Sequence, residues 1–143
     1  MIGKTNSALG SGELDTTTMP ICFLYSTTAN TSSSWQLGTL HAQSYNSDYV
    51  SYSNGVFTFT KACVCNVYGR GAGTRSSSGA VVTLQWRIGK NGDSTIIANG
   101  SGSGNTYDSA SNYSFAVGDK VSIYGKTSSG DRCSMTLMVL LSE

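Results

Sequence analysis

Charged residues are scarce in this chain. They make up 12% of its 143 residues, and nine Lys and Arg nearly balance eight Asp and Glu. No cluster of basic side chains stands out, so the sequence has no stripe suited to the phosphates of a nucleic acid. Soluble monomers of this size usually carry more surface charge. Ser, Thr and Asn take that place here, as they often do in secreted or particle-borne β-proteins.

Long apolar runs are missing as well. None reaches the roughly 18 residues that span a bilayer, so we expect no membrane insertion. Residues 1–19 contain one Lys, no apolar core of a signal peptide and no periodicity. We therefore expect no secretory signal and predict a flexible N-terminal arm, either a disordered tail or a segment that orders on a partner. Residues 20–143 are predicted to form one domain.

Catalytic motifs are also lacking. The single histidine, His41, has no nucleophile elbow near it and is interpreted as a surface or structural residue. D-x-D, H-E-x-x-H and P-loop patterns do not occur, and no pair of carboxylates can be assigned to a cleft. The segment GRGAG at 69–73 lacks the helix and the Lys-Ser/Thr that follow a phosphate loop. We predict a protein that is not an enzyme and uses no cofactor or metal.

The four cysteines are Cys22, Cys63, Cys65 and Cys133. Cys63 and Cys65 would share one face of a strand, a geometry in which they do not easily bond to each other. One C-x-C pair with two distant single cysteines is not a usual zinc spacing. Buried, reduced thiols are the favoured interpretation, with one disulfide or a metal site as the alternatives.

Glycine, serine and threonine dominate what is present, with 17 Gly, 24 Ser and 16 Thr against one proline, Pro20. Helical apolar spacing is absent, whereas short alternating runs broken by Gly, Asn and Ser recur, which predicts an all-β sandwich or barrel. The strands are predicted at 21–25, 35–43, 48–51, 56–61, 63–68, 81–89, 94–98, 113–117, 121–124 and 133–141. Residues 26–34 and the glycine-rich segment 100–104 are predicted to be loops, and the glycine-rich segment 69–73 a loop or a bulge. Turns are predicted at 54–55, 90–93 and 118–119. The inward faces name the core: Phe57, Phe59, Leu84, Trp86, Ile88, Phe115, Val121, Ile123, Leu137 and Val139.

The last predicted strand is apolar on both faces. Leu137 and Val139 belong to the inward face, yet Met138 and Leu140 on the other face are apolar too. A strand of this kind is buried on both sides. A neighbouring subunit is the favoured cover, and the N-terminal arm is the alternative. Met138, Leu140 and Tyr124 are therefore the predicted interface residues.

The order of motifs resembles a known family. It runs from NGVFTFTKA at 54–62, through an apolar strand ending in KNG at 90–92 and FAVGDKVSI at 115–123, to the hydrophobic C-terminal strand. This resembles the jelly roll of tumour necrosis factor and of the globular heads of complement component one-q, over about residues 35–143. The resemblance implies a jelly-roll sandwich of about eight to ten antiparallel strands and a compact trimer with the C-terminal strand near the three-fold axis. One departure is ACVCNVY at 62–68, where the family usually has Gly and several aromatics. The calcium sites of some relatives cannot be carried over, because the Asp residues are scattered.

The opening MIGKTN resembles the start of short virion or tail-associated proteins of phages and prophages of Gram-positive bacteria. It implies a virion protein assembled in the host cytoplasm: a head or tail fibre tip, or a decoration protein. Residues 1–19 would then bind other virion proteins. The alternatives are a bacterial surface or spore-coat adhesion module of the same fold and, less favoured, a signalling ligand.

Two polar, tyrosine-rich segments at 45–52 and 104–113 are interpreted as recognition loops. Tyr supplies rigid contact area, while Ser and Asn adapt their hydrogen bonds. Ordinary turn composition explains the same residues about equally well. The candidate ligand-binding residues are Tyr45, Asp48, Tyr49, Tyr52, Tyr107, Asp108 and Tyr113, and the expected ligand is a host cell-surface glycan or protein.

Overall fold

The computed structural model describes residues 20–29, 34–39, 41–75, 77–92, 94–127 and 131–142. The predicted arm at 1–19 lies outside the described residues. Those that are described form eleven strands and no helix, which confirms the all-β prediction. The described residues therefore contain no helix that is long and apolar enough to cross a membrane.

The strands in chain order are β1 (Pro20–Ala29), β2 (Gln36–Leu37), β3 (Ala42–Tyr45), β4 (Val50–Ser53), β5 (Val56–Phe59), β6 (Cys63–Arg75), β7 (Val81–Lys90), β8 (Thr95–Ser103), β9 (Thr106–Phe115), β10 (Lys120–Lys126) and β11 (Asp131–Leu141). All pairings are antiparallel. Sheet A has the order β3-β1-β11-β6-β9. Sheet B has the order β4-β5-β10-β7-β8, and β2 also pairs with β10.

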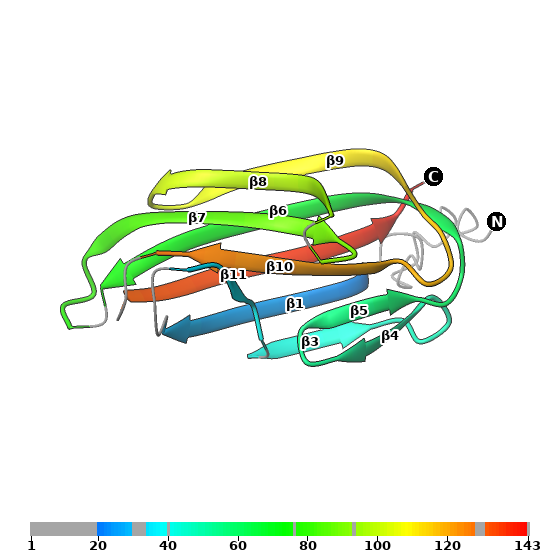
Figure 1. Ribbon diagram of the computed structural model, residues 1–143, viewed down its shortest axis with the longest axis horizontal. Coiled ribbons are helices and arrows are strands. Elements are labelled where there is room, and N and C mark those ends of the chain that lie inside the picture. Colours follow the sequence, from blue (N-terminus) through cyan, green and yellow to red (C-terminus); the bar gives the residue numbers. More distant parts are fainter. Residues whose placement is uncertain are drawn as a thin grey trace, which may run out of the picture.

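The two sheets form a sandwich whose strands run along the long axis of the molecule (Figure 1). β8 and β9 lie at one edge, and β3, β4 and β5 lie at the other. A short pairing between β6 and β7, Gly73 with Val82 and Thr74 with Val81, joins the sheets. β11 lies between β1 and β6, so the C-terminal strand is central in sheet A.

The core lies between the sheets and is built from the inward face of each strand. All ten core residues named from the sequence are buried. Trp86 is fully buried, and its indole Nε1 donates a hydrogen bond to Thr106 Oγ1 at 2.8 Å, so its polar atom is satisfied. The rings of Phe59 and Phe115 stack with centroids 4.1 Å apart and connect β5 to β9.

Residues 69–73 and 100–103 lie within strands, so the predictions of a loop or bulge at 69–73 and of a loop at 100–104 were wrong. β6 continues through 69–73 to Arg75, and β8 runs from Thr95 through Gly100 to Ser103. A Cβ atom at Gly69 or Gly71 would lie 2.3 Å from the indole of Trp86, and one at Gly100 would lie 2.4 Å from its Nε1. These glycines therefore make room for one large side chain. Glycine within a strand can mark such a close approach and need not break the strand.

Of the other local predictions, some are confirmed and some are wrong. The hairpin turns are confirmed by positive φ angles at Asn54 and Gly55 (45° and 85°) and at Asn91 and Gly92 (56° and 73°). The predicted strand 35–43 is two short strands, β2 and β3, and β1 extends to Ala29 into the predicted loop 26–34. The predicted recognition loop 104–113 is wrong: 106–113 are part of β9, which pairs with β6.

Candidate functional site

The outer face of sheet A carries a row of apolar side chains. Burial alternates along β11, so Met138 and Leu140 lie on the side opposite the core residues of that strand. The strand register places Phe23 of β1 beside Met138, and Met138 beside Tyr68 of β6. We name the apolar side chains of this surface the sheet A patch; its members are Phe23, Tyr25, Val64, Tyr68, Tyr107, Met138 and Leu140.

The sheet A patch is open to solvent in the isolated chain. Tyr107 is 69% exposed, Val64 and Tyr68 are each 41% exposed, and the other four members are half-buried. Thr136 and Arg70 lie between Tyr25 and Tyr107 in the register, and Arg70 Nη1 donates a hydrogen bond to Thr136 Oγ1 at 3.5 Å. Phe23, Met138 and Tyr68 are adjacent in the register and form a contiguous apolar row. Contiguous apolar surface on one face of a small protein usually marks an interaction site. This surface is therefore the candidate assembly site.

The three predicted interface residues do not share one face. Met138 and Leu140 belong to the sheet A patch, but Tyr124 lies on β10 of sheet B, where it pairs with Arg87 and Leu37. It sits on the outer side of that sheet, and its hydroxyl lies 3.2 Å from Ser122 Oγ. The role of Met138 and Leu140 at an interface stays a prediction.

Sequence reasoning did not name Phe23, Tyr25, Val64 or Tyr68 as part of this surface. The sequence does contain an indication of this surface. Residues 21–25, ICFLY, are apolar at every position, and the C-terminal strand is apolar at most of its positions. Such a run indicates a strand buried on both faces. The register of β1 against β11 is what brings the two runs together.

The first group of predicted ligand residues forms a cluster at the β3–β4 edge. The Tyr45 and Tyr52 rings stack with centroids 6.0 Å apart, and Tyr52 lies 4.9 Å from the Phe57 ring. The Tyr52 hydroxyl accepts the backbone N–H of Gly55 at 2.9 Å. These contacts are structural: they cover one edge of the core.

The remaining members of that segment differ in exposure. Asp48 is exposed in a turn, where its N–H donates to Asn46 Oδ1 at 2.9 Å. Tyr49 is half-buried against the core, and Lys61 Nζ lies 4.8 Å from its ring centroid. Of these two residues, Asp48 alone is freely placed for a ligand.

The second predicted group is distributed over both sides of β9. Tyr107 pairs with Arg70 on the outer side of sheet A. Asp108 points the other way and accepts the backbone N–H of Asn99 on β8 at 3.0 Å. Tyr113 is half-buried against the core and lies 5.0 Å from the Phe115 ring. The structure therefore does not bring the seven predicted residues into one site.

Comparison with solved structures identifies the architecture. The crystal structure of murine APRIL at pH 8.5 aligns with a TM-score of 0.51 and 9% identity, over 84% of this chain and 98% of the other. The structure of murine APRIL at pH 5.0 aligns with a TM-score of 0.50 and 7% identity, over 82% of this chain and 98% of the other. GITRL from bushbaby aligns with a TM-score of 0.45 and 15% identity, over 86% of this chain and 97% of the other. On the two APRIL alignments, the fold is a TNF-like jelly roll.

At such identities the likeness is one of fold alone. No family profile matches the sequence of this TNF-like jelly roll. A search of curated proteins finds no match either.

A group of cysteines lies inside this jelly roll near the start of β6. Cys22 and Cys65 are buried, Cys63 is half-buried, and the Cys63 and Cys65 Sγ atoms are 3.5 Å apart. Cys133 is buried as well, and none of these four described cysteines forms a disulfide. Burial raises the pKa of the Cys22, Cys63 and Cys65 thiols above the ordinary value of 9.0. Among the described residues, no group of three His, Cys, Asp or Glu could hold a metal ion.

These thiols are expected to react slowly while the chain is folded. The thiolate is the reactive form, and a raised pKa keeps the thiols protonated at about pH 8. Ellman's reagent should modify at most one thiol quickly in the folded protein and all four after unfolding. Cys63→Ser should remove the quick fraction. Rapid reaction of two or more thiols in the native protein would contradict the buried arrangement.

Proposed function

We propose that this chain is a non-enzymatic structural protein of a phage of Gram-positive bacteria. It forms a homotrimer in the virion, as a head or tail fibre tip or a decoration protein, and binds a glycan or protein on the host surface. Residues 1–19 attach it to other virion proteins. The sheet A patch is the observation that carries the proposal, because it gives the domain a surface for self-association.

The position of β11 supports assembly through this patch. β11 is flanked by β1 and β6, so Met138 and Leu140 lie in the middle of sheet A and not at an edge. Burying two such side chains contributes about 3–6 kcal/mol per subunit before association costs. In the family that the motifs resemble, the C-terminal strand lies near the three-fold axis of a trimer.

The virion setting is supported by two features of the sequence. The opening MIGKTN resembles phage tail-associated proteins, and a surface of Ser, Thr and Asn with few charges is found in particle-borne β-proteins. Neighbouring genes test this setting. Capsid, portal or tail genes beside this one are the expected result, whereas sporulation or collagen-like genes would contradict it.

Light scattering of the purified protein tests assembly. We expect a mass of three chains, each of 15.0 kDa, that persists on dilution to micromolar concentration. A single chain at that concentration would contradict the trimer. The measurement is independent of any ligand.

A further inference from the structure

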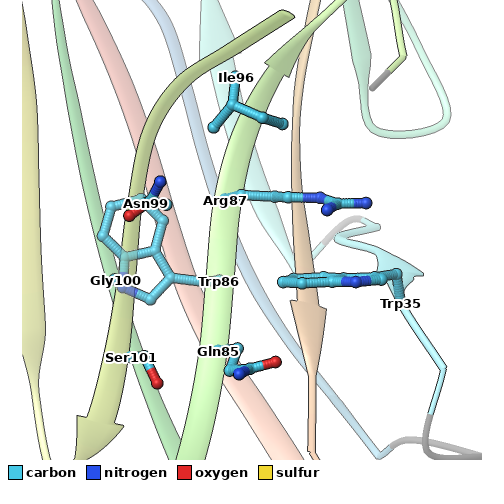
Figure 2. Close-up of a pocket in the computed structure, with 8 residues that line it drawn as sticks. All are labelled: Trp35, Gln85, Trp86, Arg87, Ile96, Asn99, Gly100 and Ser101. Carbon is cyan, nitrogen blue, oxygen red and sulfur yellow. The ribbon is translucent and has the colours of Figure 1, made fainter. Parts of the chain in front are cut away.

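A pocket of about 250 Å³ lies on the outer face of sheet B, on the side of the sandwich opposite the sheet A patch. β7 and β8 form its floor, and the segment before β2 supplies one wall (Figure 2). Its lining residues are Trp35, Gln85, Trp86, Arg87, Ile96, Asn99, Gly100 and Ser101. None of the residues named from the sequence as ligand-binding lines it, although Asp108 accepts the backbone N–H of Asn99 beside it.

The wall of the pocket is a stacked cation and aromatic ring. The Arg87 guanidinium carbon lies 3.9 Å from the Trp35 ring centroid, and Figure 2 shows the two groups extended side by side. Lys126 Nζ lies 5.8 Å from the same centroid. Stacking on Trp35 limits the motion of the Arg87 guanidinium, and Lys126 is not among the residues that line the pocket. Asp and Glu are absent from the described residues that line the pocket.

Neutral hydrogen-bonding groups lie next to this cationic wall. The register of β7 and β8 pairs Gln85 with Ser101 and Arg87 with Asn99, so two amides and one hydroxyl share the outer face with the guanidinium. Gln85, Asn99 and Ser101 are exposed, and Ile96 adds an apolar contact at 38% exposure. Donors and acceptors of this kind match the hydroxyl groups of a sugar ring.

We propose that this pocket binds one sugar unit that carries an anionic group, with the anion on Arg87. The amides and the hydroxyl bind the sugar hydroxyls. A guanidinium fork suits a carboxylate and a phosphate equally, so a uronic acid and a sugar phosphate share the required chemistry. The inference rests on the proposed function, since it specifies the glycan that the protein binds on the host surface.

The size of the pocket agrees with a single unit. Sites for small molecules usually measure about 300–1,000 Å³, so this smaller pocket has room for one terminal sugar. One such contact gives a Kd of about 1 mM. In a trimer the three pockets lie away from the sheet A patch and are free to bind together, which raises the apparent affinity for a polymer about 10²–10⁴-fold.

Titration followed by NMR tests the proposal. The probes are methyl glucuronide, glucosyl phosphate, the neutral methyl glucoside and acetate. We expect saturable shifts of the Trp35 indole N–H, assigned with Trp35→Phe, for the glucuronide or the phosphate. The stronger of these two identifies the anion. Binding should weaken as salt concentration rises, because the contact is between charges.

Three variants provide the matched comparison. Arg87→Gln should weaken binding at least about tenfold, because it removes a charge-assisted hydrogen bond. Arg87→Lys keeps the charge but lacks the forked guanidinium, so its affinity should lie between those of the unaltered protein and Arg87→Gln. Lys120→Gln removes the same charge from an exposed position of β10 and should bind like the unaltered protein. Thermal unfolding of each variant establishes that the fold is retained.

The other outcomes overturn the proposal. If methyl glucoside binds as tightly as methyl glucuronide, the anionic group does not contribute to binding. If acetate binds as tightly, the sugar does not contribute, and an acidic protein side chain is the better ligand. Absence of a shift at Trp35 at about twenty times the expected Kd would exclude the site. Light scattering on the same samples separates this inference from assembly: a monomer that binds glucuronide refutes only the trimer, and a trimer that binds no probe refutes only the pocket.

Discussion

Met138→Lys is expected to convert the proposed trimer into folded monomers. Met138 is half-buried on the outer side of β11, so a Lys at this position reaches water in the isolated chain. In the assembly it would place an unpaired charge within an apolar contact, which costs about 3–5 kcal/mol. That cost raises the dissociation constant at least about 100-fold per contact. Light scattering should give a single chain at micromolar concentration.

Two variants control for charge and for position. Thr83→Lys adds the same charge at an exposed position of β7 in sheet B and should leave the trimer intact. Tyr124→Lys tests the sequence-based interface against the structure, and should also leave it intact, because Tyr124 lies on sheet B. A trimeric Met138→Lys protein would place the interface on another surface. Loss of the monomer fold would show that Met138 belongs to the core.

Gly71→Val is expected to have the largest effect on stability. A Cβ atom at Gly71 would lie 2.3 Å from Trp86 Cδ1 and 2.7 Å from Leu84 Cδ2. Trp86 is fully buried and cannot move aside without opening the core. Overpacking a core costs about 1–3 kcal/mol, and Val adds two methyl groups beyond the Cβ, so the loss should be about 3 kcal/mol or more. Denaturant unfolding gives the free energy.

The neighbouring position and a compensating change test the cause. Ala72→Val adds bulk on the same strand but on the outer face of sheet A, and should change stability by less than about 1 kcal/mol. Gly71→Ala should cost less stability in a Trp86→Leu background than in the unaltered protein, because the clashing ring is absent there. A loss in Gly71→Ala that is the same with Trp86 or Leu present would show that strand propensity, and not contact with the indole, is the cause.

Alternation along the chain predicted the all-β class, the inward faces and the ten core residues. These features depend on the period of two in a strand, which requires no knowledge of neighbours. The Asn54-Gly55 and Asn91-Gly92 turns were predictable for the same reason, since positive φ angles are a local property of those residue pairs. The two-faced apolar character of the C-terminal strand is also local.

Features that depend on distant residues were decided by the tertiary structure alone. Gly69, Gly71 and Gly100 lie within strands and are glycine because Trp86 packs against them. A local pattern does not distinguish such glycines from those of a loop. The separation of Tyr124 from Met138 follows from which sheet each strand joins. Trp35 and Arg87 meet only because β2 and β7 both pair with β10. Sequence by itself determined the faces of the strands, and the pairing of strands determined which faces form one surface, because pairing brings together residues that are far apart along the chain.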